Sequence, residues 1–224
     1  IDFTLYGDGT VVARDATAKT PPADGAIQRG SPFLRGQLDE AQVQALLEFA
    51  IGEGGLGKAK ARYEVADTDD FKHSIFTIRA DGLDKRVEVI GSNSPFQALE
   101  DRLLDVVTES SMTTKTWKAD RFLGQLYDAA SMIEVDVLPQ VKEAGSLAWP
   151  WPDISPADFA HVASDFAGTR TLSAAEAAIA GLSDHGGVIE RVYLRDPKTP
   201  TVYAFSMWPL PPDATSARGV IRNR

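Results

Sequence analysis

The sequence contains no cysteine among its 224 residues. This absence excludes disulfide bonds, a thiolate nucleophile and every metal site that depends on sulfur ligands. It does not identify the cellular compartment. The chain begins at Ile1 rather than at a methionine, and we expect that a signal peptide or a lipoprotein leader preceded it.

The sequence also lacks an excess of positive charge and any long apolar run. Lys and Arg number 23 against 32 Asp and Glu, which gives a formal net charge of -9. Such a chain repels the phosphates of nucleic acids, and no cluster of Lys and Arg offsets the repulsion, so we expect no nucleic-acid partner. No apolar run approaches the roughly 20 residues that span a bilayer, so the sequence predicts no transmembrane segment.

The sequence also lacks motifs that would identify a catalytic activity. The histidines His73, His161 and His185 lie far apart in the sequence, and none belongs to a His-Glu-x-x-His array. His185 stands just before Gly186, where it suits the end of a helix. No serine occupies a Gly-x-Ser-x-Gly turn, so a Ser-His-Asp triad would have to be assembled from residues scattered along the chain.

The sequence does contain local signals for turns and for the ends of helices. In the opening "FTLYGDGTVV", Asp8-Gly9 separates two β-favouring runs and predicts a hairpin turn rather than a ligand-holding loop. Residues 15 to 32 are rich in Pro, Gly and small polar residues, and predict a long surface connection. A helix follows from Leu38, with Asp39 and Gln42 placed to cap its first turn.

A second hairpin and a second helix complete the first half. The stretch 73–91 turns at Asp81-Gly82, and Ser94-Pro95-Phe96-Gln97 is typical of a helix start. Residues 1–110 therefore predict the order hairpin, helix, hairpin, helix, with both helices on one face of an antiparallel sheet. Residues 108–118 predict the seam between the two halves.

The second half, residues 119–224, repeats part of this order. Ser173 and Glu176 form a capping box, and two strand-like runs flank residues 196–200. Strand, helix and hairpin thus occur in 33–91 and again in 169–207, and "RGQLDEAQ" resembles "TRTLSAAE", which suggests a distant repeat. We predict an α+β fold with antiparallel sheets, helices on one face and two similar halves packed as one unit.

Two groups of residues are candidates for chemistry. The segment "DTDDFKH" carries oxygen and nitrogen ligands suited to a hard cation such as Ca²⁺: Asp67, Asp69, Asp70 and His73. The EF-hand pattern fails, because Lys72 and Ile78 stand where Gly and Glu are required, and an acidic, solvated approach to a strand is the favoured interpretation. The other group contains tryptophans beside prolines, which could bind sugars or a partner, although we favour burial: Trp149, Trp151 and Trp208.

Several segments together resemble uncharacterised bacterial domains of exported proteins and lipoproteins. They are "FTLYGDGTVV", "LRGQLDEAQVQALLEFA", the aromatic Tyr63 with the second hairpin, and the ending "VYAFSMWPLPPD", which is similar to a Pro-Leu-Leu-Pro-type terminus. The resemblance implies export and a style of fold, and it transfers no catalytic residue.

Three functional hypotheses follow. The first is a non-enzymatic extracytoplasmic binding module that uses the loop 15–32 to contact an unknown protein or another cell-envelope partner, with no cofactor. The second is a metal-dependent or other hydrolase that uses the segment from Asp67 to His73. The third is an inhibitor that inserts the loop 15–32 into the cleft of an enzyme.

Overall fold

The computed structural model describes residues 2–20, 27–64, 73–80, 82–91, 95–108, 112–129, 145–161, 167–179, 188–196 and 198–212. These residues form helices and mainly antiparallel sheets, as an α+β fold requires. Among them, one compact unit is built from residues up to Ala16 and from Arg35–Thr114. The other is built from Thr17–Leu34 and from Lys115 onward, so one change of unit falls within the predicted seam 108–118.

The first unit contains two separate small sheets. In one, the strands β1 (Phe3–Leu5), β2 (Thr10–Arg14) and β4 (Phe33–Gln37), which begins in the other unit, lie in the order β1-β2-β4. In the other, β5 (Arg62–Glu64), β7 (Leu83–Ile90) and β6 (His73–Ala80) lie in the order β5-β7-β6, with β5 parallel to β7. The predicted hairpins are β1-β2 and β6-β7.

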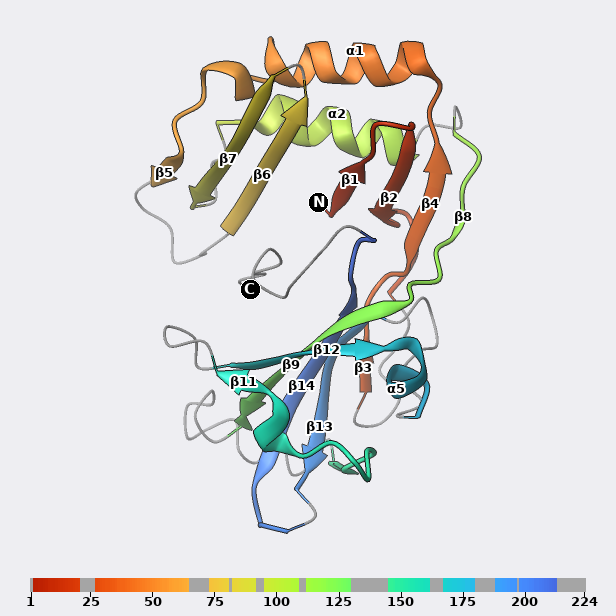
Figure 1. Cartoon of the computed structure of the whole chain (residues 1–224), viewed down its shortest axis with the longest axis vertical. Helices are drawn as coiled ribbons and strands as arrows, with labels where there is room; N and C mark the ends of the chain where they lie inside the picture. The colour runs from red at the N-terminus through yellow and green to blue at the C-terminus, as the bar shows by residue number, and fades with distance from the viewer. Residues whose placement is uncertain are drawn as a thin grey trace. The chain divides into compact units, whose positions relative to one another are not determined.

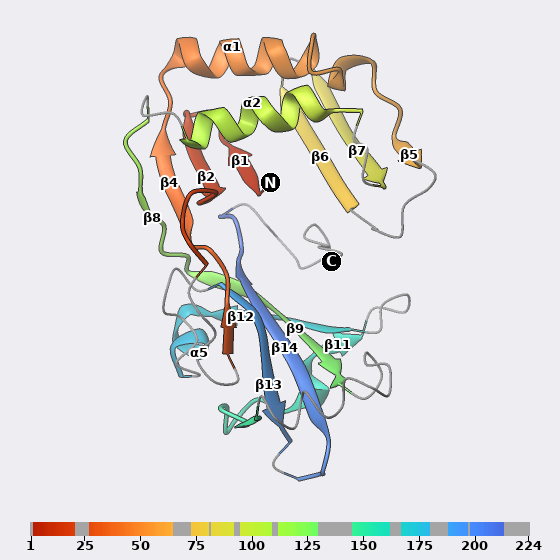
Figure 2. The same ribbon diagram turned by 180° about the vertical axis from the view of Figure 1, so that it is seen from behind.

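Two helices cover the same side of both sheets (Figure 1, Figure 2). Helix α1 spans Glu40–Ile51, a short 3-10 helix η1 spans Leu56–Lys58, and α2 spans Gln97–Thr108. The expected order hairpin, helix, hairpin, helix is confirmed. The single sheet expected beneath the helices is instead two sheets, because among the strands that the structure describes β6 pairs only with β7 and β1 only with β2.

Local signals fix the start of this unit as expected. Asp8 is exposed in the turn, where its carboxylate accepts the Thr10 amide at 2.9 Å, and this hydrogen bond holds the pKa of Asp8 below its usual range. Gly9 has φ 82°, the left-handed region that favours glycine. Asp39 caps α1 by accepting the Gln42 amide at 2.8 Å, while the Gln42 side chain accepts the Asp39 amide at 2.9 Å. The opening is a hairpin bend, and the predicted capping box is confirmed.

The second unit is built on one large sheet with the strand order β10-β13-β14-β9-β12-β11, and β3 pairs with β13 as well. Its strands are β3 (Ile27–Arg29), β9 (Arg121–Asp128), β10 (Leu147–Ala148), β11 (Ala160–His161), β12 (Gly168–Ser173), β13 (Ile189–Arg195) and β14 (Val202–Pro209). A short strand β8 (Lys115–Thr116), a 3-10 helix η2 (Pro156–Asp158) and the helix α5 (Ala174–Ile179) complete the described elements.

A strand, a helix and a hairpin occur in both stretches, as β12-α5-β13-β14 and as β4-α1-β5-β6-β7, where the strand β5 stands between the helix and the hairpin. The pairing differs between the two occurrences. In the first unit the hairpin forms its own sheet with β5, whereas β14 of the second hairpin joins the same sheet as β12 through β9. Residues Ser173 and Glu176 form the predicted capping box at the start of α5, with the Ser173 amide 2.7 Å from the Glu176 carboxylate.

One expectation about the chain is wrong. The sequence predicts a long surface connection over residues 15–32, but Ile27–Arg29 form the strand β3, which pairs with Ile189–Val192 of β13. Arg29 is buried in this strand. A partner strand some 160 positions away in the sequence stabilises β3, and no local pattern of three residues reveals such a partner.

Candidate functional site

Among the residues that the structure describes, the predicted metal ligands are not brought together. Asp67, Asp69 and Asp70 lie outside the described residues, and so does His185. His73 is the first residue of β6 and His161 the last of β11, but the structure describes only their backbones. Within the described ranges, no group of three or more His, Asp or Glu side chains is placed to hold a metal ion. The metal site therefore stays a prediction.

The most distinctive feature of the first unit is the interruption between its two sheets. Strand β1 ends one sheet and β6 ends the other, and in both views no described strand lies between them (Figure 1, Figure 2). An edge strand carries a row of backbone N–H and C=O groups without a sheet partner. Two such rows face the same interruption.

In β1, the residues whose backbone groups point toward the interruption can be identified from the hairpin. The Arg14 amide donates to the Asp2 carbonyl and the Tyr6 amide to the Thr10 carbonyl, both at 2.9 Å. Because hydrogen-bonded pairs alternate in an antiparallel ladder, Phe3 and Leu5 direct their amides and carbonyls away from β2. They form the outer edge of this sheet.

The same argument identifies the edge of β6. The Glu88 amide donates to the Ala61 carbonyl at 2.9 Å, so it points toward β5 and away from β6. Its partner across the ladder, Ile75, is therefore in a non-hydrogen-bonded pair and directs its own backbone groups outward. Counting in steps of two, Thr77 and Arg79 do the same. His73, which pairs with Ile90, does so as well, and the two edges together present six residues with outward backbone groups.

The helices close one side of the interruption with apolar side chains. Leu47 of α1 and Leu103 of α2 each pack against both hydrophobic clusters of the unit. Phe3 and Leu5 contact the first cluster and Phe76 the second, and all five side chains are only half-buried. An extended segment lying between β1 and β6 would cover this partly exposed apolar surface.

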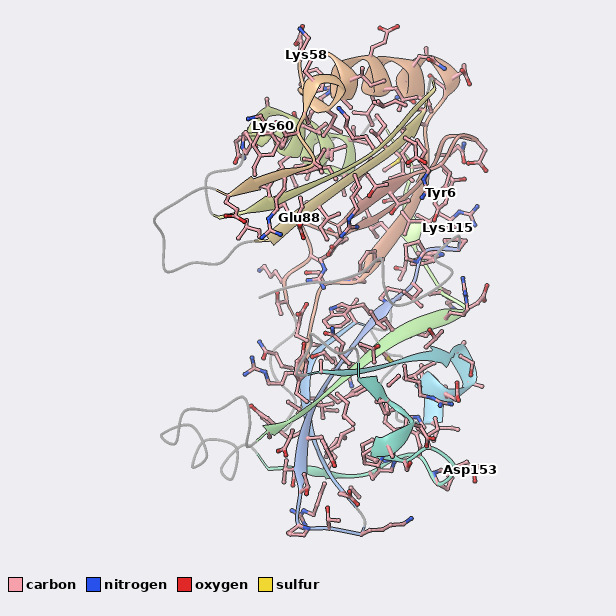
Figure 3. All side chains as sticks on the ribbon, turned by 60° about the vertical axis from the view of Figure 1, so that its left-hand side comes forward. Tyr6, Lys58, Lys60, Glu88, Lys115 and Asp153 are labelled. Atoms are coloured by element: carbon pink, nitrogen blue, oxygen red, sulfur yellow. The ribbon has the colours of Figure 1, made fainter. Side chains whose placement is uncertain are left out.

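The opposite face of the sheet β5-β7-β6 is charged, and most of its charges are paired, Arg86 being the exception among the described residues. Arg62 lies 2.8 Å from Glu64 and 3.6 Å from Glu88, and Arg79 lies 3.3 Å from Asp84. Figure 3 shows Glu88 on this sheet, and Lys58 and Lys60 near its other end, by the helices. The pairs Arg62–Glu64 and Arg79–Asp84 are well exposed, so each contributes little to stability. They keep this face polar without closing the edge of β6.

The tryptophans act mainly as anchors in the second unit. Trp151 and Trp208 are 2% and 4% exposed, which confirms burial, whereas Trp149 is half-buried and departs from that expectation. The indole N–H of Trp151 donates to the Glu176 carbonyl at 2.7 Å, and that of Trp149 donates to the Ile154 carbonyl. The indole donors of Trp149 and Trp151 are thus used within the chain.

Tyr203 lies beside Trp149 near the start of β14. Their ring centroids are 6.3 Å apart in an edge-on arrangement. Burial raises the pKa of Tyr203, and the carboxylates of Asp196 and Asp128 raise it further. The phenol therefore stays protonated at neutral pH and is no candidate for a nucleophile.

The chain matches no protein-family model, no curated protein and no solved structure. Within the part of the chain that the structure describes, no helix has the length and apolar character that a membrane span requires.

Proposed function

We propose that this protein is a non-enzymatic binding module that acts outside the cytoplasm and captures an extended segment of a partner protein by strand addition. The observation that carries the proposal is the pair of strand edges, β1 and β6, which lie beneath the same two helices and which no other described strand pairs with. Strand addition supplies affinity through main-chain hydrogen bonds and specificity through alternate side chains.

The directions of the strands favour a single inserted strand. β1 and β6 run the same way (Figure 1, Figure 2). A segment that runs the opposite way would be antiparallel to both and would extend the alternation of β7, β6, β1 and β2. It would pair with the backbone groups of Phe3 and Leu5 on one side and of Ile75, Thr77 and Arg79 on the other.

The chemistry of the partner segment follows from the two faces of the interruption. Side chains that point toward α1 and α2 would meet Leu47, Leu103 and Phe76, so alternate residues of the segment should be apolar. The remaining side chains would lie beside Arg79 and Asp84 and should be polar. A segment with period-two alternation is therefore the expected ligand.

Location outside the cytoplasm is supported by the resemblance of the N-terminal and C-terminal segments to exported bacterial domains. Fractionation of cells that express the natural gene product tests it directly. We expect the protein in the envelope or in the medium, and recovery in the cytoplasmic fraction would contradict this part of the proposal.

The binding proposal is tested with peptides selected from a random display library and with the variant Thr77→Pro. The Thr77 amide points outward, so proline removes a donor that the β6-β7 ladder does not use. We expect the variant to fold and to bind the selected peptides about tenfold more weakly or worse. The loss of one backbone hydrogen bond and the altered shape of the edge together should cost more than about 1.4 kcal/mol of binding free energy, which corresponds to a factor of ten. The matched control Thr77→Val keeps the amide and should bind normally.

Amide hydrogen exchange locates the peptide. Bound peptide should slow the exchange of the Leu5 and Thr77 amides together. Peptides that bind Thr77→Pro as tightly as the wild type, or that protect amides elsewhere, would show that the edges are not the binding site. Protection that depends on protein concentration without peptide would identify a second copy of the chain as the occupant.

A further inference from the structure

Arg29 is a buried cation in an unusual position. It ends the edge strand β3, opposite Ile189 of β13, and only 7% of its surface is exposed. Its Nη1 atom is enclosed and has no hydrogen-bond partner. Among the described residues, no ion pair includes Arg29.

The register of the sheet places Arg29 on an apolar face. Ile189 pairs with Arg29 on one side and with Met207 on the other, and Met207 pairs with Gly124 of β9. Ile189 and Met207 are fully buried. A guanidinium remains charged at every physiological pH, so losing a proton cannot relieve the cost of enclosing it. That cost amounts to several kcal/mol unless an anion compensates it.

The nearest acidic side chain on β13 does not supply this compensation. Glu190 lies against Gly30, the residue after Arg29, and therefore on the other face of β3. Glu190 also has an interaction of its own. The same cross-strand row continues from Gly124 to Arg170 of β12. Arg170, unlike Arg29, has an anionic partner, because its Nη2 lies 3.2 Å from the Glu176 carboxylate.

We infer that Arg29 binds an oxyanion, a carboxylate or a phosphate group, that a ligand supplies at the β3 edge of the large sheet. The planar fork of a guanidinium matches two oxygens of either group, and charge-assisted bonds of this type are the strong ones. The site lies in the second unit, so it is independent of the strand edges β1 and β6 and adds a second binding function.

The test compares urea unfolding of the wild type and of Arg29→Met in chloride buffer, then with added sodium acetate or sodium phosphate at constant ionic strength. In chloride alone, Arg29→Met should be as stable as the wild type or more stable, because methionine removes an uncompensated buried charge. Acetate or phosphate should raise the wild-type midpoint in a saturable way and leave that of Arg29→Met unchanged. Response to acetate alone identifies a carboxylate, and response to phosphate alone a phosphate.

The control Arg195→Met removes an exposed arginine from the adjacent strand and should keep the full response. Equal shifts in the wild type and Arg29→Met would mean a general salt effect and would overturn the inference. So would a marked loss of stability or of folding in Arg29→Met in chloride, because it would show that the chain itself supplies the anion. As a second readout, ¹⁵N NMR of the wild-type arginine side chains should show the Arg29 guanidinium signals shifting with the added oxyanion.

Discussion

The ammonium group of Lys85 donates a hydrogen bond to the carbonyl oxygen of Gly57, 2.9 Å away. The same group donates to the carbonyls of Leu56 at 3.1 Å and Ala59 at 3.0 Å. One side chain of β7 thus satisfies all three donors of its ammonium with the turn that follows α1. The turn leads directly into β5, so Lys85 fixes the path of the chain from the helix to the edge of the sheet.

Replacing Lys85 by methionine should lower the free energy of unfolding by about 2 to 3 kcal/mol. Hydrogen bonds to charged groups contribute about 1.5 to 3 kcal/mol each, and water can replace part of them at this half-buried position. Urea unfolding measures the loss. The control Lys58→Met removes an exposed lysine from the same turn and should change stability by less than about 0.5 kcal/mol. Equal effects of the two substitutions would show that the three carbonyls do not depend on Lys85.

Strand β3 gives a second prediction, which separates the two parts of the segment 15–32. Gly30 donates its amide to the Val188 carbonyl, so Gln28, two residues earlier, also directs its amide toward β13. The substitution Gln28→Pro should therefore lower the free energy of unfolding by about 1 to 3 kcal/mol, since it removes a ladder donor and leaves the carbonyl that it served without a partner. The substitution Lys19→Pro, in the exposed part of the segment, should leave the melting temperature nearly unchanged. A melting temperature that Gln28→Pro does not lower would contradict the pairing of β3.

The alternative of a metal-dependent hydrolase is tested by thermal shift with Ca²⁺, Mg²⁺ and Zn²⁺. A metal that binds only the folded state must raise the melting temperature. At one hundred times its dissociation constant it adds about 2.7 kcal/mol to the free energy of unfolding. For a binding module without a metal we expect no shift at millimolar concentration. A shift that disappears when Asp67, Asp69 and Asp70 are changed to Asn would instead establish the acidic segment as a metal site.

The elements that the sequence predicts well are those whose signals are local. Asp8-Gly9 predicts a hairpin because the turn needs a residue that tolerates positive φ. Asp39 and Ser173 predict helix starts because a capping side chain and its amide lie three residues apart. In each case the residues that form the contact are neighbours in the chain, so a single sequence contains the whole interaction.

What the sequence hides depends on distant partners. The pattern of β6 predicts a strand, but whether β6 pairs with β1 is decided by how two sheets meet beneath α1 and α2. Ile27–Arg29 read as a loop because the β13 strand that stabilises them lies far along the chain. Thus the α+β class and the helices could be predicted, whereas the two facing edges and the buried Arg29 required the structure.

The capping box of α5 makes a prediction about pH. The Ser173 amide and hydroxyl donate to the Glu176 carboxylate at 2.7 and 2.8 Å, and Arg170 lies 3.2 Å from its other oxygen. The backbone hydrogen bond from Ser173 is the main reason that the pKa of Glu176 is lowered from its ordinary value of 4.5. Because the folded state favours the ionised carboxylate, the group stabilises the fold above the unfolded pKa, and this contribution is lost as the pH falls through the folded pKa.

Glu176→Gln should accordingly be less stable than the wild type by about 1 kcal/mol near neutral pH, because the amide oxygen accepts the same hydrogen bonds without a charge. The gap between the two proteins should stay constant from neutral pH down to the unfolded value near 4.5 and then shrink at lower pH. Urea unfolding at a series of pH values measures it. Ser173→Ala removes a hydroxyl that donates to the Glu176 carboxylate and also accepts the Glu176 amide, so its gap should shrink only in part at low pH. A gap that stays constant into the acid range would mean that the charge of Glu176 contributes nothing to the start of α5.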